Sequence, residues 1–275
     1  MYLKSMLNKV ALYLVCAIIV LLLASAMDSS IAAENYSCSA EAIRIPTADF
    51  EPKSLAFRDA RQMRYVAGNI VIAGNGYFSA TIRKQIAEGV AKTLNDYSGF
   101  ADLSVSPVSG SPDRYGRERV NLFGEANQHW MQLDLVEAGL ALVYPEDGAP
   151  KCLERLFEAE RTARKNKAGV WQVPGLIMHS NDADWQKRAQ SFQMVEGTLL
   201  SIGKTSFRYY LNFGDNWSED FTVIVAKRNI KRFKMKYDDL KRLAGKKIRV
   251  RGWLIQDRGP LIELFHPGQI EIDIQ

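Results

Sequence analysis

The segment from Asp113 to Trp171 reads DRYGRERVNLFGEANQHWMQLDLVEAGLALVYPEDGAPKCLERLFEAERTARKNKAGVW. We expect a strand at 118–124 and a helix that ends near residues 139–141. Residues 151–168 carry the strongest helical pattern of the chain, and Gly169 is placed to cap that helix. Its inward apolar residues are Leu153, Leu156, Phe157 and Ala163. The segment therefore predicts a mixed β and α domain.

Upstream of this segment the pattern also mixes strands and helices. Residues 63–73 are rich in β-forming side chains, and the turn signal Gly74-Asn75-Gly76 follows them. Residues 80–94 place Ile82, Ile86, Val90 and Leu94 at four-residue intervals, which is typical of an amphipathic helix. A further strand is expected at about 100–106. We interpret the apolar stripes as core rather than binding surface.

A different pattern begins after residue 191. The preceding stretch, 174–191, starts with Pro174-Gly175 and is polar, so we expect a linker there. Five alternating runs follow, at 192–202, 207–213, 220–226, 247–255 and 260–265. One helical stretch, at about 229–243, lies between the third and fourth runs. Five strands with a helix after the third is the element order of an OB-fold, a small barrel.

Several motifs of the 113–171 segment resemble, in order and spacing, the second half of the thermonuclease (staphylococcal nuclease-like) family. They are Asp113-Arg114-Tyr115-Gly116-Arg117, the helix residues 135–141, Val143-Tyr144 and Ala168-Gly169-Val170-Trp171. Residues 64–68 (RYVAG) resemble a strand of the family's first half. The resemblance implies a mainly β fold with packed helices, with an OB-like barrel of the staphylococcal nuclease type at 34–173. Residues 192–275 add a second, smaller OB-like five-stranded barrel, as in some exported bacterial nuclease-like proteins.

The family's chemistry is calcium-dependent hydrolysis of phosphodiester bonds. Carboxylates hold Ca²⁺ and activate water, and two arginines stabilise the negative charge of the transition state. Arg117 matches one of these catalytic arginines, and Arg64 lies where the other would fall. The family's acidic residues after this strand are missing, because the chain continues Asn69-Ile70-Val71-Ile72-Ala73-Gly74. We therefore expect a degenerate hydrolytic site, with no metal and no cofactor.

Two alternatives remain open. An active metal-dependent phosphodiesterase (endonuclease) would use Arg117 with carboxylates that do not align with the family, and Ca²⁺ as its cofactor. Asp49, Glu51, Asp96 and Asp102 are the candidates for such a rebuilt site, although solvated surface carboxylates are the commoner explanation. The other alternative is a structural envelope component that binds no polymer.

Residues 1–33 have the layout of a signal peptide. Lys4 and Lys9 precede an apolar run at 10–23, and small residues follow at 24–26 and 32–33. The run is shorter than the roughly 20 residues that span a bilayer, which favours cleavage and a periplasmic or secreted protein over an uncleaved anchor. No other segment is expected to span a membrane.

Two cysteines remain once residues 1–33 are removed. Cys38 and Cys152 are an even number of cysteines in an oxidising compartment, and we predict a disulfide between them. Two unrelated buried thiols are the alternative. A metal site is disfavoured, because these cysteines stand alone and the three histidines show no ligand spacing.

The basic excess of the chain lies in its last third. The 275 residues are 47% hydrophobic and 24% charged, which excludes disordered and collagen-like classes, and the formal net charge is +5. Residues 192–275 hold 15 basic and 10 acidic residues. The candidate nucleic-acid-binding residues are Lys227, Arg228, Lys231, Arg232, Lys246, Lys247, Arg249 and Arg251.

Aromatic residues are interleaved among the strands of this basic region. They are Phe207, Tyr209, Tyr210, Phe213, Trp217, Phe221 and Trp253. Cations beside rings suit single-stranded nucleic acid, because bases stack on rings and phosphates pair with cations. The alternation of the strands predicts that about half of the rings lie in the core. An anionic glycan, a membrane surface or a protein partner would use the same cations.

Overall fold

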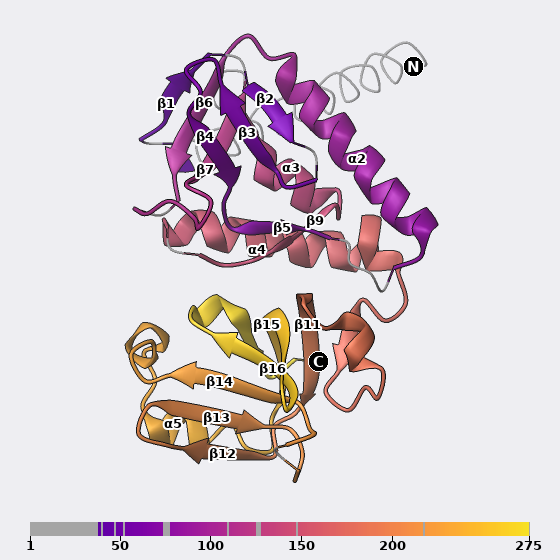
Figure 1. Ribbon diagram of the computed structural model, residues 1–275, viewed down its shortest axis with the longest axis vertical. Coiled ribbons are helices and arrows are strands. Elements are labelled where there is room, and N and C mark those ends of the chain that lie inside the picture. Colours follow the sequence, from indigo (N-terminus) through magenta and orange to yellow (C-terminus); the bar gives the residue numbers. More distant parts are fainter. Residues whose placement is uncertain are drawn as a thin grey trace, which may run out of the picture.

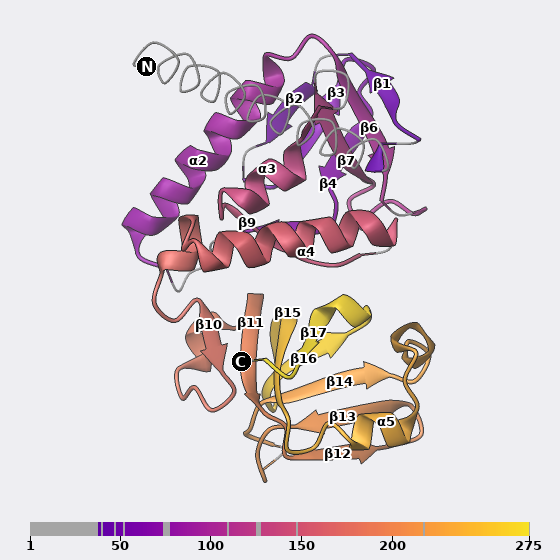
Figure 2. The ribbon, with the colours of Figure 1, turned by 180° about the vertical axis from the view of Figure 1, so that it is seen from behind.

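Two sheet-rich regions organise the chain, as Figures 1 and 2 show. The structure is a computed structural model, and it describes residues 38–39, 41–46, 48–51, 53–73, 78–108, 110–124, 128–146, 148–216 and 218–274. The expected signal peptide at 1–33 lies outside the described residues. Among the helices described, none combines the length and the apolar character needed to cross a membrane.

The first region contains most of the described α-helices. Its elements are β1 Ile43–Ile45, β2 Ala48–Glu51, β3 Ala56–Asp59, β4 Arg64–Ala67, β5 Ile70–Ile72, α2 Ala80–Ser98, β6 Leu103–Pro107, β7 Glu118–Gly124, β8 His129–Trp130, α3 Met131–Glu137, β9 Ala141–Val143, α4 Pro150–Lys165 and the 3₁₀ helix η1 Gly169–Gln172. The strands and helices predicted at 80–94, 100–106, 118–124 and 151–168 are therefore present. In α2 the stripe buries Ile86, Val90 and Leu94, as its four-residue spacing predicts.

The second region is mainly β. Its elements are β10 Ile177–His179, η2 Trp185–Arg188, β11 Ser191–Thr198, β12 Ser201–Lys204, β13 Arg208–Asn212, β14 Thr222–Ala226, η3 Ile230–Phe233, α5 Tyr237–Lys241, β15 Lys247–Asp257, β16 Gly259–Leu264, η4 Pro267–Gln269 and β17 Ile270–Ile272. All five alternating runs form strands. The helix expected at 229–243 is divided into η3 and α5 at Lys234, which has a positive φ of 50°.

The two main sheets share one pairing scheme. The first has the order β1-β6-β7-β4-β3-β2, and the second has β11-β15-β16-β14-β13-β12 with β10 added beside β11. In each order the third and fourth strands pair in parallel, β7 with β4 and β16 with β14, and the other neighbours in these two orders pair antiparallel. This is the strand pattern of the OB-fold. The predicted fold class, mainly β with packed helices, is confirmed.

The sheets differ from the expectation of closed barrels. Each hydrogen-bonded path is open: the first ends at β1 and β2, and the second ends at β10 and β12. Between β11 and β12, Leu199 donates its N–H to Lys246 O (3.0 Å) and Leu200 donates to Asn212 O (2.8 Å). The chain therefore pairs with β15 before this point, as β11, and with β13 after it, as β12.

Two further segments depart from the sequence expectation. The β-rich stretch 63–73 breaks into β4 and β5 at Gly68 and Asn69, where Asn69 has a φ of +61° and β5 leaves to pair with β9. A Cβ at Gly68 would lie 2.9 Å from Val108, so only glycine fits this close approach. The segment 174–191, expected as a linker, carries β10, which pairs in parallel with β11.

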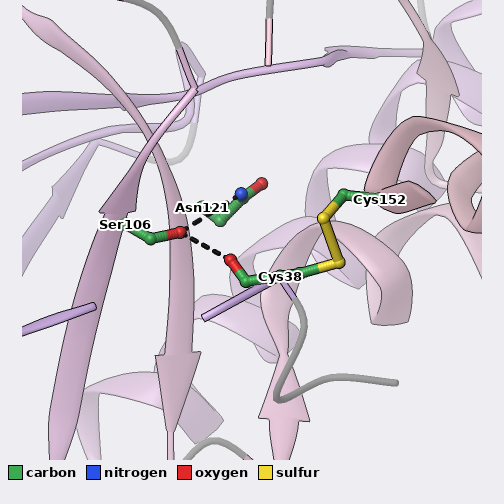
Figure 3. Close-up of a disulfide and its surroundings, with 4 residues drawn as sticks. All are labelled: Cys38, Ser106, Asn121 and Cys152. Carbon is green, nitrogen blue, oxygen red and sulfur yellow. Dashed lines mark hydrogen bonds between the residues drawn. A yellow bond between two sulfur atoms is a disulfide. The ribbon is translucent and has the colours of Figure 1, made fainter. Parts of the chain in front are cut away.

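The predicted disulfide between Cys38 and Cys152 is present. Figure 3 shows it joining the start of the described chain to α4, across a sequence separation of 114 residues and a Cα–Cα distance of 5.5 Å. The Ser106 hydroxyl donates a hydrogen bond to the Cys38 carbonyl (2.8 Å), and Asn121 donates to the Ser106 hydroxyl (3.3 Å). The bridge thus fixes residue 38 against the first sheet.

The two regions are joined by a buried ion pair beside α4, which runs along the boundary in Figures 1 and 2. Arg251 of β15 is 1% exposed, and its Nη1 donates to Glu160 of α4 (2.7 Å) and to the Val143 carbonyl (3.0 Å). Its Nη2 lies 2.6 Å from Glu271. Phe192 of β11 also packs into the core of the first region. The side chains of β15 near Arg251 are thereby held against the first region.

Candidate functional site

The turn before β7 positions Arg117. Asp113 Oδ1 accepts hydrogen bonds from the backbone N–H groups of Tyr115 (2.9 Å) and Arg117 (3.0 Å). Gly116 has a φ of +70°, a conformation that glycine adopts without steric cost, and its N–H donates to the Asp113 carbonyl. The local sequence Asp-Arg-Tyr-Gly-Arg therefore specifies this turn by its own side chains.

Asp113 also holds the guanidinium group of Arg117. Its Oδ2 lies 2.8 Å from Nε and 2.7 Å from Nη2 of Arg117, and the two side chains are 10% and 17% exposed. Burial would raise the pKa of Asp113, but hydrogen bonds from the Arg117 side chain and from backbone N–H groups outweigh it and lower the pKa. Asp113 therefore keeps its negative charge and orients a charged Arg117.

An exposed ring lies beside Arg117. Tyr115 is 54% exposed, and the guanidinium carbons of Arg114 and Arg117 lie 4.8 and 5.0 Å from the centre of its ring. These distances are within the range of cation–π attraction. The turn thus presents two guanidinium groups and one aromatic ring together.

Arg119 is held by Glu146. Nε of Arg119 lies 3.0 Å from Glu146 Oε1, while Glu146 Oε2 accepts a hydrogen bond from the Asn69 N–H (3.1 Å). Asn69 Oδ1 in turn accepts from the Glu146 N–H (2.8 Å). Arg117 directly precedes β7, Arg119 is the second residue of that strand, and both line one pocket. This pocket therefore has two arginines that are each paired with a carboxylate.

These groups line one pocket of about 590 Å³. Its charged wall consists of Asp113, Arg114, Arg117, Arg119 and Glu146, and its apolar wall includes Val66, Ala67, Ile70 and Val71. Tyr144 also lines it, and burial together with the Glu146 charge raises the pKa of this phenol, which is therefore neutral. Trp253 and Phe265 come from the second region, so both regions build this pocket.

Residues 84–173 match the protein-family model described as Staphylococcal nuclease homologue. This part of the chain is similar to the staphylococcal nuclease family, and we call the first sheet-rich region, which contains it, the nuclease-like domain. The match begins within α2 and ends after η1, so it includes Arg117, Arg119 and Glu146 and leaves Arg64 and Asn69 outside. The resemblance indicated by the motifs of residues 113–171 is therefore confirmed. No curated protein matches the chain.

The carboxylates of the nuclease-like domain do not fit the calcium site of the family's chemistry. In the part of the chain that the structure describes, no three His, Cys, Asp or Glu side chains are grouped to hold a metal. Asp113 and Glu146, which line the pocket, each bind an arginine instead. Two carboxylates already engaged by cations offer too few hard oxygen ligands for Ca²⁺.

The carboxylates proposed for a rebuilt site are not brought together. Asp49 lies on β2, Glu51 accepts a hydrogen bond from the Ser54 hydroxyl (3.0 Å), Asp96 of α2 lies 3.4 Å from Lys92, and Asp102 lies 2.6 Å from Arg44. Each has a local environment at or near the protein surface. They therefore supply no common site with Arg117.

Arg64 lies beside the pocket without lining it. In the parallel pairing of β4 with β7, Tyr65 lies opposite Glu118 and Val66 opposite Arg119. Arg64 and Arg117 each stand one residue before the first of these pairs, on neighbouring strands. Arg64 also lies on the same face of the sheet as Val66, which lines the pocket. Its side chain is exposed.

The eight candidate basic residues of the second region do not form one exposed face. Arg249 and Arg251 are 8% and 1% exposed, and both are bound by carboxylates, Arg249 by Glu196 (2.9 Å) and Arg251 by Glu160. We therefore remove these two from the candidate binding surface. Lys246 lies 2.8 Å from Asp273, and Lys227 is half-buried. Arg228, Lys231, Arg232 and Lys247 are exposed.

The aromatic residues divide between core and surface, but Phe207 departs from the alternation, because it precedes β13 and does not share the buried face of Tyr209. Phe221 and Tyr209 are 0% and 8% exposed, whereas Phe207 and Trp253 are 80% and 49% exposed. Trp217 lies outside the described residues. Trp253 lines the pocket around Arg117, whereas Phe207 does not.

The sequence interpretation missed Arg119, Glu146 and Trp253 as members of this site. Arg119 has a local signal, because it stands only two residues after Arg117. Glu146 has none, since it meets Asn69 across 77 residues of sequence. Trp253 requires the arrangement of the two regions, which the sequence pattern does not specify.

Proposed function

We propose that this chain is an exported nuclease-like protein that binds single-stranded nucleic acid through the pocket around Arg117, with a degenerate hydrolytic site. The observation that carries the proposal is the pair Arg117 and Arg119, partly buried, oriented by carboxylates and open to a pocket. Oriented guanidinium groups bind phosphate through charge-assisted hydrogen bonds. The disulfide between two buried cysteines supports an oxidising compartment, hence a periplasmic or secreted location.

The missing carboxylates support binding without cleavage. Asn69 stands where the resemblance to the family places an acidic residue, and its amide is used to hold the Glu146 backbone. Loss of a general base alone costs about 10²–10⁴ in rate. We further propose two domains, a nuclease-like domain at 34–173 and a basic OB-like domain at 192–275, joined through residues 174–191.

The purified protein provides a direct test of this proposal. We expect it to bind a fluorescently labelled oligo-dT in anisotropy titrations, with an affinity that falls as salt rises. Arg117→Ala should weaken binding about 10- to 100-fold, because it removes charge-assisted hydrogen bonds. Arg161→Ala removes an exposed arginine of α4 that does not line the pocket, and it should leave the affinity unchanged. Absence of binding at low salt would overturn the binding proposal.

An active phosphodiesterase is the second candidate, and Glu146 is the observation that favours it. This carboxylate lines the same pocket as Arg117, and in this alternative it would be the general base that activates water. We expect the protein to leave single- and double-stranded DNA and RNA intact in Ca²⁺, Mg²⁺ or Mn²⁺. Metal-dependent cleavage that Arg117→Ala abolishes would establish the phosphodiesterase instead.

A further inference from the structure

A second pocket adjoins the one around Arg117. It measures about 360 Å³, and it shares two lining residues with the first pocket, Val71 of β5 and Trp253 of β15. Its other lining includes Phe78, Leu176 and Lys187, so it too has walls from both sides of the boundary. The two pockets therefore adjoin at Val71 and Trp253, between the nuclease-like domain and the second region, and we refer to them together as the groove.

Among the aromatic rings that the second region contributes to this groove, that of Trp253 is the most exposed. It is 49% exposed, and neither hydrophobic core includes it. On β15 it lies opposite Phe192 and two residues after Arg251, whose buried ion pair with Glu160 binds β15 to α4. The indole is thus attached to a strand that is held at the domain boundary. A large apolar ring exposed between two pockets and beside arginines fits a ligand that has a flat face and a negative charge.

We propose that this groove binds one segment of single-stranded nucleic acid, with a phosphate at Arg117 and Arg119 and an unpaired base stacked on Trp253. The inference rests on the proposed function and adds a base-stacking contact that the second region supplies through Trp253. A base offers its face to a ring only when it is unpaired or unstacked, so stacking on Trp253 selects single strands over duplex. Lys187 lines the second pocket and pairs with Asp184 (2.9 Å), and its exposed ammonium group would exchange this partner for a phosphate of the continuing backbone.

The ion pair of Arg251 gives the groove a fixed shape before the ligand binds. The guanidinium is held by Glu160, Glu271 and the Val143 carbonyl, and its carbon lies 4.9 Å from the centre of the Phe157 ring. Because both walls are joined through these contacts, binding needs no reorientation of the two regions. Preorganisation of this kind reduces the entropic cost of binding.

Substitution of Trp253 tests the stacking contact. In anisotropy titrations with labelled dT₁₂, Trp253→Ala should weaken binding about 5- to 100-fold, and Trp253→Phe should restore most of the loss because it keeps a ring. Phe207→Ala is the matched control, since Phe207 is 80% exposed and lines neither pocket. A duplex of the same length should bind more weakly than dT₁₂ to the natural protein and lose little affinity in Trp253→Ala.

Salt dependence separates stacking from charge. The slope of log affinity against log salt should be unchanged in Trp253→Ala and reduced by about 1 in Arg117→Ala. If Arg117→Ala weakens binding while Trp253→Ala binds like the natural protein, the groove inference is overturned and the Arg117 pocket stands. If the natural protein binds no oligonucleotide, the proposed function itself fails. As a control for folding, Trp253→Ala should unfold at the same midpoint temperature as the natural protein, so that a loss of binding does not reflect a loss of fold.

Discussion

Glu146 is a single side chain that organises three parts of the pocket. It pairs with Arg119, accepts the Asn69 N–H and contributes to the raised pKa of Tyr144. Its negative charge also opposes that of any phosphate in the pocket. The same group thus orders the site and lowers its affinity for anions.

Glu146→Gln separates these two roles. Glutamine keeps an oxygen acceptor for the Asn69 N–H and removes the charge, so we expect affinity for oligo-dT to rise at least about 3-fold at low salt. Glu118→Gln is the matched control, because residue 118 alternates to the opposite face of β7 from Arg119. Weaker binding by Glu146→Gln would contradict this expectation. In the phosphodiesterase alternative, the same substitution would abolish cleavage.

Local residues of the site could be predicted from the sequence, and distant ones could not. The turn at 113–117 depends on Asp113 and Gly116, which lie within five residues, so the position of Arg117 follows from short-range chemistry. The contact of Asn69 with Glu146 depends on β5 pairing with β9, which no local pattern specifies. Arg249 and Arg251 looked like surface cations because their carboxylate partners are far away in sequence.

Helix α4 and strand β15 meet through the buried pair of Glu160 and Arg251. The Glu160 side chain is 4% exposed, and its Oε1 also accepts the Val143 N–H (2.7 Å). Removing one partner of such a pair leaves an uncompensated charge in the interior. The contact between the two elements therefore depends on both side chains.

Arg251→Met should lower the free energy of unfolding by about 3–5 kcal/mol, because Glu160 then remains buried without its cation. Urea unfolding followed by circular dichroism measures the change. The double variant Glu160→Gln and Arg251→Met should recover part of the loss, since it removes the isolated charge and keeps an acceptor for the Val143 N–H. A loss below about 1 kcal/mol in the single variant, or no recovery in the double variant, would show that this pair does not join the elements.

The strands were predictable as elements, whereas their pairing was not fully so. Alternation in 192–265 located β11 to β16, although it joined β11 and β12 into one run, and the order of strands and helix indicated the OB-fold scheme. The divisions at Asn69 and Lys234 depend on single positive-φ residues, which periodicity does not detect. β10 became a strand because β11 offered it a free edge, although its own sequence resembles a linker.

Helix α4 carries three contacts that hold the whole molecule together: a disulfide, a buried ion pair and a core side chain. Cys152 near its start carries the disulfide, Glu160 in its third turn binds the second region, and Leu156 between them is fully buried in the core. The disulfide closes a loop of 114 residues that contains most of the nuclease-like domain. In the chain-entropy account, closing such a loop restricts the unfolded chain far more than the folded one.

Cys38→Ser with Cys152→Ser should therefore lower the free energy of unfolding by about 2–5 kcal/mol relative to the oxidised protein. Denaturant unfolding with and without reductant gives the same comparison in the natural chain, and the double serine variant should not respond to reductant. Thiol titration of the exported protein under denaturing, non-reducing conditions is the matching chemical test, because Cys38 and Cys152 should both be unreactive. If both titrate as free thiols, the disulfide does not form in the cell and the argument from it to an oxidising compartment fails.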